Sequence, residues 1–195
     1  MSGARLWLGA RVRICAAMRL FPGILISFIA LAAPVLAQPR PVKPVPARPA
    51  AAAPKAVGKF DDWTAATNLE AGQKVCYAFT RAAGSTPALP GRGEAVLLTV
   101  TQRQGGRDAV SLSAGFEYGA SAAVAVQADA AAFEFYTAKR SAFARDGRAT
   151  VAALLKAARV VAKSPGPRGG EIVDSFSLKG FARAYEAIGR ECPAK

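Results

Sequence analysis

The sequence contains no histidine, and cysteine is scarce, since the 195 residues include only Cys15, Cys76 and Cys192. Without an imidazole, the chain lacks the general base of Ser-His-Asp and Cys-His hydrolases and any histidine-containing metal site. Three cysteines are one too few for a thiolate zinc site, which carboxylates seldom complete. We therefore expect no metal, no cofactor and no catalytic activity.

Acidic residues are also few, because 13 Asp and Glu stand against 26 Lys and Arg, which leaves a formal net charge of +13. Much of this charge lies before residue 59, and the remaining chain carries +5. Its cations are spread out, whereas a nucleic-acid-binding surface clusters them among aromatic residues. We expect no nucleic acid partner; peripheral contact with an anionic envelope surface is compatible with this charge.

An uncharged apolar run at residues 20–37 follows a segment with four arginines and ends in small residues. This order is typical of a secretory signal peptide, so we assign residues 1–37 to a leader that is removed on export. The alternative is a retained membrane anchor, because a run of about 18 residues is near the lower limit for spanning a bilayer. Met18 is a second candidate start, and Cys15 would then lie outside the protein.

Residues 38–58 are rich in proline and alanine and contain four cations but no acidic residue. Such a segment has little apolar surface to bury, so an extended tether with polyproline character is expected. A proline-rich recognition motif is the alternative interpretation. In either case, the folded domain is predicted to cover residues 59–195.

Within that domain, apolar residues alternate with small or polar ones, a period of two that indicates β-strands with one buried face. The expected strands cover residues 75–80, 95–101, 110–118, 124–126 and 133–135, followed by a hairpin of 159–163 and 171–176. Closely spaced strands with polar turns favour a compact antiparallel β-sandwich or a barrel-like sheet.

Helical spacing is present in two places after residue 146. Residues 148–158 are rich in alanine and leucine, and Asp146 or Thr150 is the expected N-cap. A second, C-terminal helix is predicted after Ser177 as its N-cap, with an apolar face that includes Phe181 and Tyr185. The fold class is therefore mostly β with two short helices, one of them C-terminal.

Removal of the leader leaves Cys76 in the first predicted strand and Cys192 near the end of the chain. An even number of cysteines in an oxidising compartment predicts a disulfide between them. The alternative is a pair of buried free thiols that do not meet. A catalytic dithiol is disfavoured, because the sequence contains no Cys-x-x-Cys.

Several segments together resemble the invasion-associated locus B family of exported bacterial envelope proteins. They are Phe60-Asp61-Asp62-Trp63, the stretch Val75-Cys76-Tyr77-Ala78-Phe79-Thr80, and Phe176-Ser177-Leu178-Lys179-Gly180-Phe181 followed by Ala184 and a terminal cysteine. The resemblance covers about residues 60–193. It implies a signal peptide, a compact β-rich fold with a C-terminal helix, and a periplasmic or outer-surface location in a Gram-negative bacterium. The resemblance implies no catalytic residues.

Two groups of side chains are candidates for a binding surface. Asp61, Asp62 and Trp63 place two acids beside an aromatic ring, which suits a ligand-binding lip; alternatively, the aromatic ring anchors the tether to the core. Further along the chain, four cations surround a single acid and suit an anionic glycan, lipid or partner, with a solvated loop as the alternative. They are Lys139, Arg140, Arg145 and Arg148.

These observations lead to one functional hypothesis. We expect an exported cell-envelope protein that acts by binding, presenting a disulfide-closed β-rich surface to an envelope or host component. The alternative is a periplasmic inhibitor or protective protein that acts on a cell-wall hydrolase.

Overall fold

A computed structural model describes residues 53–194 of the chain, so the predicted leader, most of the predicted tether and Cys15 lie outside the described residues. The strands are β1 (Lys55–Phe60), β2 (Trp63–Glu70), β3 (Gln73–Arg81), β4 (Gly84–Thr86), β5 (Val96–Arg103), β6 (Gly106–Ala114), β7 (Ala123–Ala128), β8 (Ala131–Ala138), β9 (Ser141–Ala144), β10 (Arg159–Pro165) and β11 (Glu171–Ser177). The helices are a short 3-10 turn, η1 (Gly93–Ala95), and α1 (Gly147–Leu154) and α2 (Phe181–Glu191).

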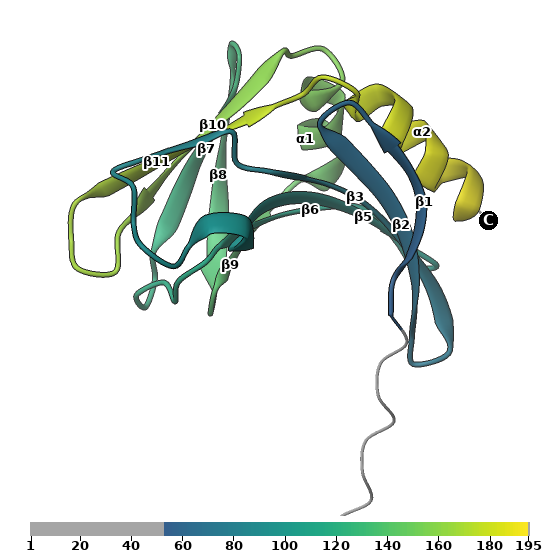
Figure 1. The fold of residues 1–195 in the computed structure, drawn as a ribbon, viewed down its shortest axis with the longest axis horizontal. Coiled ribbons are helices and arrows are strands. Elements are labelled where there is room, and N and C mark those ends of the chain that lie inside the picture. The colour runs from purple at the N-terminus through teal and green to yellow at the C-terminus, as the bar shows by residue number, and fades with distance from the viewer. Residues whose placement is uncertain (1–52, 195) are drawn as a thin grey trace, which may run out of the picture. The chain divides into compact units, whose positions relative to one another are not determined.

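All strands belong to one antiparallel sheet in the order β1-β2-β3-β5-β6-β9-β8-β7-β10-β11-β4 (Figure 1). The predicted fold class is confirmed: the domain is mostly β, with two α-helices, one of them C-terminal. The sheet does not close into a barrel, because β1 and β4 are both edge strands.

A bend in the chain places the β11–β4 edge of the sheet next to β3 and β5. After β3, the Ala82 amide donates to the Val96 carbonyl at 3.0 Å, whereas the next amide, of Ala83, donates to the Ser175 carbonyl at 2.8 Å. One continuous segment therefore leaves the β5 ladder and joins β11 as β4. Strands that switch partners at such a bend are typical of sandwich-like sheets.

Both edges of the sheet are protected against pairing with another strand. In β1, the register shifts between Ala56 and Gly58, and Lys55 and Lys59 are exposed. In β4, only three residues pair before Pro87 follows. A bulge, lysines, short length and proline are devices that discourage edge-to-edge association.

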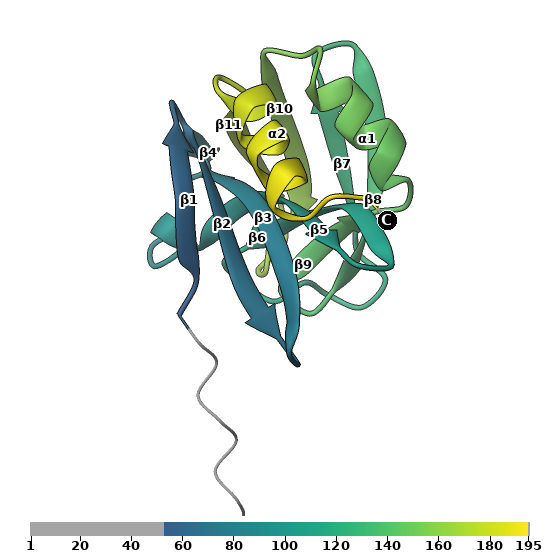
Figure 2. The same cartoon turned by 90° about the vertical axis from the view of Figure 1, so that its right-hand side faces the viewer.

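Both α-helices lie on the same side of the central strands, and within the described residues Figures 1 and 2 show no α-helix on the opposite side. Helix α2 contacts β1, β2 and β3, and α1 contacts β6. The core between these layers contains Trp63, Phe135, Phe176 and Phe181, which are essentially inaccessible to solvent. No helix among the described residues has the length and apolar character needed to cross a bilayer.

Of the two predicted helix N-caps, the structure confirms the one of α1 and corrects the one of α2. Asp146 caps α1, because its Oδ1 accepts the Ala149 amide at 2.9 Å, as predicted. The prediction of Ser177 as the cap of α2 is wrong. Ser177 ends β11, where its Oγ accepts the Lys179 amide, and Gly180 is the N-cap with φ of 89°. A glycine is needed there, because a Cβ would meet the Phe60 carbonyl oxygen at 2.0 Å.

Other boundaries differ from the sequence prediction. Strand β1 begins at Lys55, inside the segment predicted as tether, because its backbone pairs with β2. The predicted strand at residues 110–118 ends at Ala114, where Gly115 has a positive φ and turns the chain. Strands β1, β2, β4 and β9 were not predicted, because their ladders are set by partners distant in sequence or by short turns.

Candidate functional site

Two half-buried aromatic side chains form the centre of a groove on the helix-free side of the sheet. Tyr77 and Phe79 alternate along β3 with Cys76, Ala78 and Thr80, which are buried toward α2. Their ring centroids are 6.3 Å apart. Together with neighbours on β1, β2 and β5 they line a cavity of about 450 Å³. We call this cavity the Phe79 groove, and its other lining residues are Pro54, Ala56, Thr64, Ala66, Leu97 and Thr99.

A row of directly paired residues extends from the Phe79 groove across five strands. Phe79 pairs with Thr99, Thr99 with Ser111, Ser111 with Phe143, and Phe143 with Tyr136. The rings of Phe143 and Tyr136 are stacked, with centroids 5.6 Å apart. We call the surface around this row the open face; it has aromatic rings at both ends and hydroxyl groups between them.

The strand spacing gives the dimensions of the open face. Neighbouring strands lie about 4.8 Å apart, so Phe79 and Phe143 are separated by three spacings, or about 14 Å. Tyr136 lies one strand further, at about 19 Å from Phe79 by the same estimate. Tyr136 is 44% exposed, whereas Phe79, Thr99 and Ser111 are partly buried by their neighbours.

The open face carries little net charge, because its phenol is protonated and the arginines beside it are paired with glutamates. Partial burial, and secondly the carboxylate of Glu70, raise the pKa of the Tyr77 phenol above its ordinary value, so this phenol stays protonated at neutral pH. At one rim, Arg81 pairs with Glu94 at 3.2 Å. At the other rim, Arg145 lies 3.9 Å from Glu134.

A more polar cavity of about 360 Å³ adjoins the Phe79 groove and shares Thr64 and Phe79 with it. Asp61 and Asp62 line this cavity. Asp61 is held by Arg183 of α2 and by Lys179, which precedes that helix and whose Nζ lies 3.8 Å from its carboxylate.

The main chain of Asp62 is fixed by the buried Thr80 hydroxyl, which donates to the Asp62 carbonyl at 2.7 Å. The Asp62 side chain itself is exposed. Of the three residues predicted as a lip, the two acids therefore lie beside the groove.

The third member of the predicted lip, Trp63, is a core residue. Its side chain is 0% exposed, its indole Nε1 donates to the Ser177 carbonyl at 2.9 Å, and its ring packs on Phe181. Trp63 therefore presents no surface to a ligand, and its ring lies in the core. The side chain faces α2 because it is at the start of β2, on the same face as buried Ala65.

The four cations predicted as a basic patch lie in different surroundings. Lys139 and Arg140 form the turn between β8 and β9, where an Arg140 Nη2 donates to the Gly115 carbonyl at 2.6 Å. Arg145 lies over the Tyr136 ring, 5.6 Å from its centroid.

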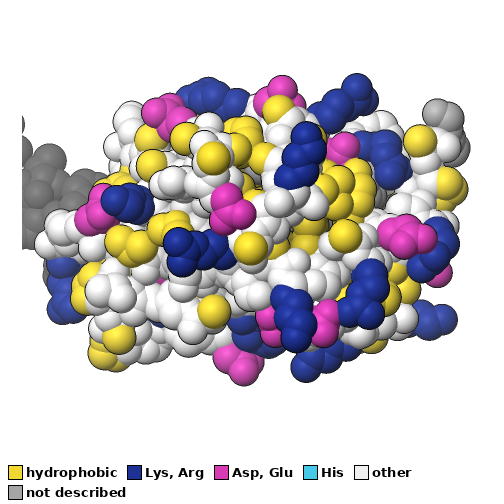
Figure 3. All heavy atoms as spheres, turned by 90° about the horizontal axis from the view of Figure 1, so that it is seen from above, with side chains coloured by type: hydrophobic (Ala, Val, Ile, Leu, Met, Phe, Trp, Pro, Cys, Tyr) yellow, Lys and Arg dark blue, Asp and Glu magenta, His cyan; other side chains and the backbone are white. Residues whose placement is uncertain are grey.

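Arg148, on α1, lines a separate cavity together with Arg103 and Arg107. In the view of Figure 3, cations and acids are interspersed over the helix side of the domain. The four predicted cations therefore do not form one patch.

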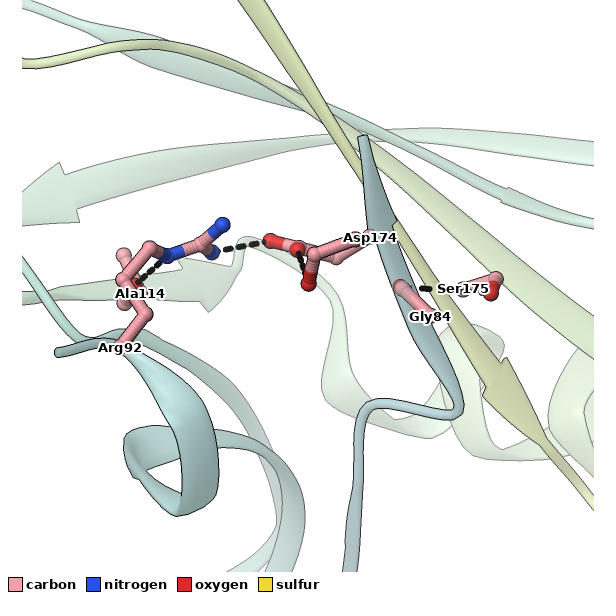
Figure 4. Close-up of polar contacts among 6 residues, drawn as sticks. Gly84, Arg92, Ala114, Asp174 and Ser175 are labelled. Carbon is pink, nitrogen blue, oxygen red and sulfur yellow. Dashed lines mark hydrogen bonds and ion pairs between the residues drawn. The ribbon is translucent and has the colours of Figure 1, made fainter. Parts of the chain in front are cut away.

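A buried ion pair was missed by the sequence analysis. Arg92 Nη2 lies 2.6 Å from Asp174 Oδ2, and the two side chains are 5% and 1% exposed (Figure 4). Arg92 Nε also donates to the Ala114 carbonyl at 2.7 Å, and the Ser85 hydroxyl donates to Asp174 Oδ1 at 2.6 Å. These bonds join β4, η1, β6 and β11, so the cluster holds the bend beside the Phe79 groove in place.

The phenol of Tyr118 lies close to this ion pair. Its pKa is raised to about 12, chiefly by burial; the Ser164 hydroxyl lowers it, the Asp174 carboxylate raises it and Arg92 lowers it. The phenol is therefore neutral in the folded protein at physiological pH. Among residues 53–194, no group of three Asp, Glu, Cys or His side chains is arranged to hold a metal ion.

Comparison with known proteins places the chain in a family. The model of the Invasion associated locus B (IalB) protein family matches residues 63–189. The chain belongs to the IalB family. The family resemblance identified in the sequence is thus confirmed. No curated protein matches the chain.

A solved member provides a structural comparison. The crystal structure of invasion associated protein B from Bartonella henselae is similar, with a TM-score of 0.51 and 18% sequence identity. The similarity covers 69% of this chain and 96% of that one. At this identity the comparison supports the IalB fold and carries no information about binding residues.

The disulfide predicted from the even number of cysteines is present in the structure. Cys76 in β3 and Cys192 at the C-cap of α2 are bonded, with Cα atoms 6.1 Å apart. The bond joins residues 116 positions apart and ties α2 to the sheet on the side opposite the Phe79 groove.

Proposed function

We propose that this IalB-family protein is an exported component of the bacterial cell envelope that acts by binding, and that the open face is its binding surface. Family membership and the leader-like sequence at residues 1–37 support export. The bond between Cys76 and Cys192 supports it further, since disulfides persist in oxidising compartments.

The observation that carries the binding role is the row from Phe79 to Tyr136. A protein that only needed a core would gain nothing from placing aromatic rings on the side away from both helices. Yet Tyr77, Phe79, Phe143 and Tyr136 all lie on that side. Aromatic rings with a few polar groups between them are typical of ligand sites and interface centres.

Binding rather than catalysis is proposed because the charged groups beside the open face are already engaged. Glu94 and Glu134 are each within 4 Å of an arginine, and Asp61 is held by two cations. Carboxylates that act as general acids or bases are usually shifted toward neutral pKa by burial or by like charges. Glu94, Glu134 and Asp61 instead face cations, which is not the surrounding expected of such a group.

The test is co-sedimentation of the full-length chain, expressed with its own leader, with purified cell-wall sacculi and with outer-membrane vesicles from the same cells. We expect one fraction to retain the wild-type protein and to lose Phe79→Ala, while Leu155→Ala is retained. Leu155 is a matched control, because it is an exposed apolar side chain at the C-cap of α1, away from the open face. Equal retention of all three proteins, or of none, would refute the role of the open face.

A further inference from the structure

We propose that the open face binds a neutral glycan chain that lies across the strands from Phe79 to Tyr136. This inference rests on the proposed function, because it names the class of ligand for the same surface. It follows from the order of side chains in the row, from the pairing of charges at its rims, and from the way the two edge strands are protected.

The order of side chains is the first argument. Rings are present at both ends, Phe79 at one and Phe143 with Tyr136 at the other. Between them lie the hydroxyls of Thr99 and Ser111. A sugar has weakly polar C–H faces that stack on aromatic rings and hydroxyl edges that donate and accept hydrogen bonds. A glycan chain repeats these C–H faces and hydroxyl edges along its length, so it is complementary to a surface on which aromatic rings are separated by hydroxyl groups.

The rows on either side of the main row continue the same chemistry. Tyr77 is paired with Thr101, and Leu97 with Ser113, which in turn pairs with Ser141. The area between the rings is therefore a floor of Ser and Thr side chains on three strands. A hydroxyl group both donates and accepts, which suits the many hydroxyls of a glycan without requiring one fixed orientation.

The charge of the surface favours a neutral glycan over an anionic polymer. In the described residues, the row from Phe79 to Tyr136 contains no charged side chain. The arginines beside the row are Arg81 at one rim and Arg145 over the Tyr136 ring, and they are matched by Glu94 and Glu134. An anionic polymer would meet these two carboxylates without gaining an unmatched cation between them.

The geometry also distinguishes a glycan from an extended peptide. A peptide that binds by adding a strand needs an open sheet edge. Here β1 is bulged and carries exposed lysines, and β4 is only three residues long. A ligand on the open face meets side chains only, which is the arrangement that suits ring stacking.

The experiment is isothermal titration calorimetry of the full-length protein with three neutral tetrasaccharides: chitotetraose, cellotetraose and maltotetraose. Polygalacturonate serves as the anionic comparison. We expect at least one neutral tetrasaccharide to bind, and both Phe79→Ala and Tyr136→Ala to weaken that binding by about tenfold or more. Thr99→Val preserves the side-chain shape and should weaken binding by a smaller factor. Leu155→Ala should bind as the wild type does.

Several results would overturn the inference. They are the absence of binding to all three neutral tetrasaccharides, binding that is unchanged in Tyr136→Ala, and binding to polygalacturonate alone. A dimer in sedimentation velocity that Phe79→Ala abolishes would assign the open face to a second copy of the chain instead. Circular dichroism of each variant verifies its fold, and Tyr136→Ala alters an exposed side chain that the core does not need.

The two hypotheses fail separately. If an envelope fraction retains the wild-type protein but not Phe79→Ala, and no tetrasaccharide binds, then the glycan proposal fails and the proposed function stands. If it sediments with neither fraction, the proposed function fails whatever the calorimetry shows.

Discussion

The rings of Trp63 and Phe181 are in contact, with centroids 4.6 Å apart and planes at 52°. Trp63 begins β2 and Phe181 begins α2, so this contact joins the first long strand to the last helix. The Trp63 indole also donates to the Ser177 carbonyl just before the helix. Helix α2 is thereby held against the side of the sheet opposite the open face.

Truncation of this contact should destabilise the domain strongly. We expect Phe181→Ala to lower the free energy of unfolding by about 3–5 kcal/mol, because it removes a fully buried ring and leaves a cavity. Urea unfolding followed by circular dichroism measures the change. Phe116→Ala is a useful comparison, because that ring is only partly buried. An unchanged midpoint for Phe181→Ala would contradict the packing of α2.

Gly180 is expected to tolerate no side chain. Its φ is +89°, and an added Cβ would lie 2.0 Å from the Phe60 carbonyl oxygen, so Gly180→Ala should cost more than about 2 kcal/mol. Gly189→Ala in the same helix is the matched control. Nothing lies within 4 Å of that position, and alanine should stabilise the helix there by about 0.5–1 kcal/mol. Thermal melting of both variants tests the contrast, and similar shifts would contradict it.

The buried ion pair should behave as a coupled unit. Asp174→Ala or Arg92→Ala alone leaves an uncompensated buried charge, and each should cost about 3–5 kcal/mol. In Arg92→Ala with Asp174→Ala, no buried charge remains, and the loss should be well below the sum of the single losses. A double-mutant cycle in urea measures the coupling. Additive single losses would show that the two groups do not stabilise each other.

Alkaline pH should weaken the fold through Tyr118. Its pKa is raised from 10.0 to about 12, chiefly by burial, so the folded protein holds the phenol proton more tightly than the unfolded chain. The corresponding stability is complete below pH 10 and is lost as the pH rises toward 12. Urea unfolding at pH values on either side of 10 should show this loss in the wild type and a smaller loss in Tyr118→Phe. An equal loss in both proteins would assign the effect to other groups.

The disulfide should contribute a large part of the stability. Cys76 and Cys192 are 116 positions apart, and in the chain-entropy model closing a loop of this length contributes about 4–5 kcal/mol. We expect Cys76→Ala with Cys192→Ala to unfold at correspondingly lower urea concentration. A non-reducing digest of exported protein should contain the two linked peptides. Two alkylatable thiols in freshly exported, folded protein would show that the bond does not form in the cell.

Several features followed from the sequence because they depend on local patterns. The β-branched run of strand length at residues 95–101 predicts β5, and an aspartate before an alanine-rich segment predicts the cap of α1. Cys76 and Cys192 are the two cysteines that follow the predicted leader, so an even count predicted their bond. Family membership was also recognised in the order of short segments from Phe60 to the terminal cysteine.

The open face and the buried ion pair were decided by the tertiary structure. Alternation in β3 divides its side chains between two faces, but it does not say which face is inside. Because the large rings of Trp63 and Phe181 fill the space beside α2, small Ala78 faces the core and Phe79 faces outward. Arg92 and Asp174 are 82 residues apart, and the bend into β4 brings the start of η1 next to β11. Local periodicity determines strands and caps, whereas the inward face and long-range partners depend on how the whole sheet closes around its core.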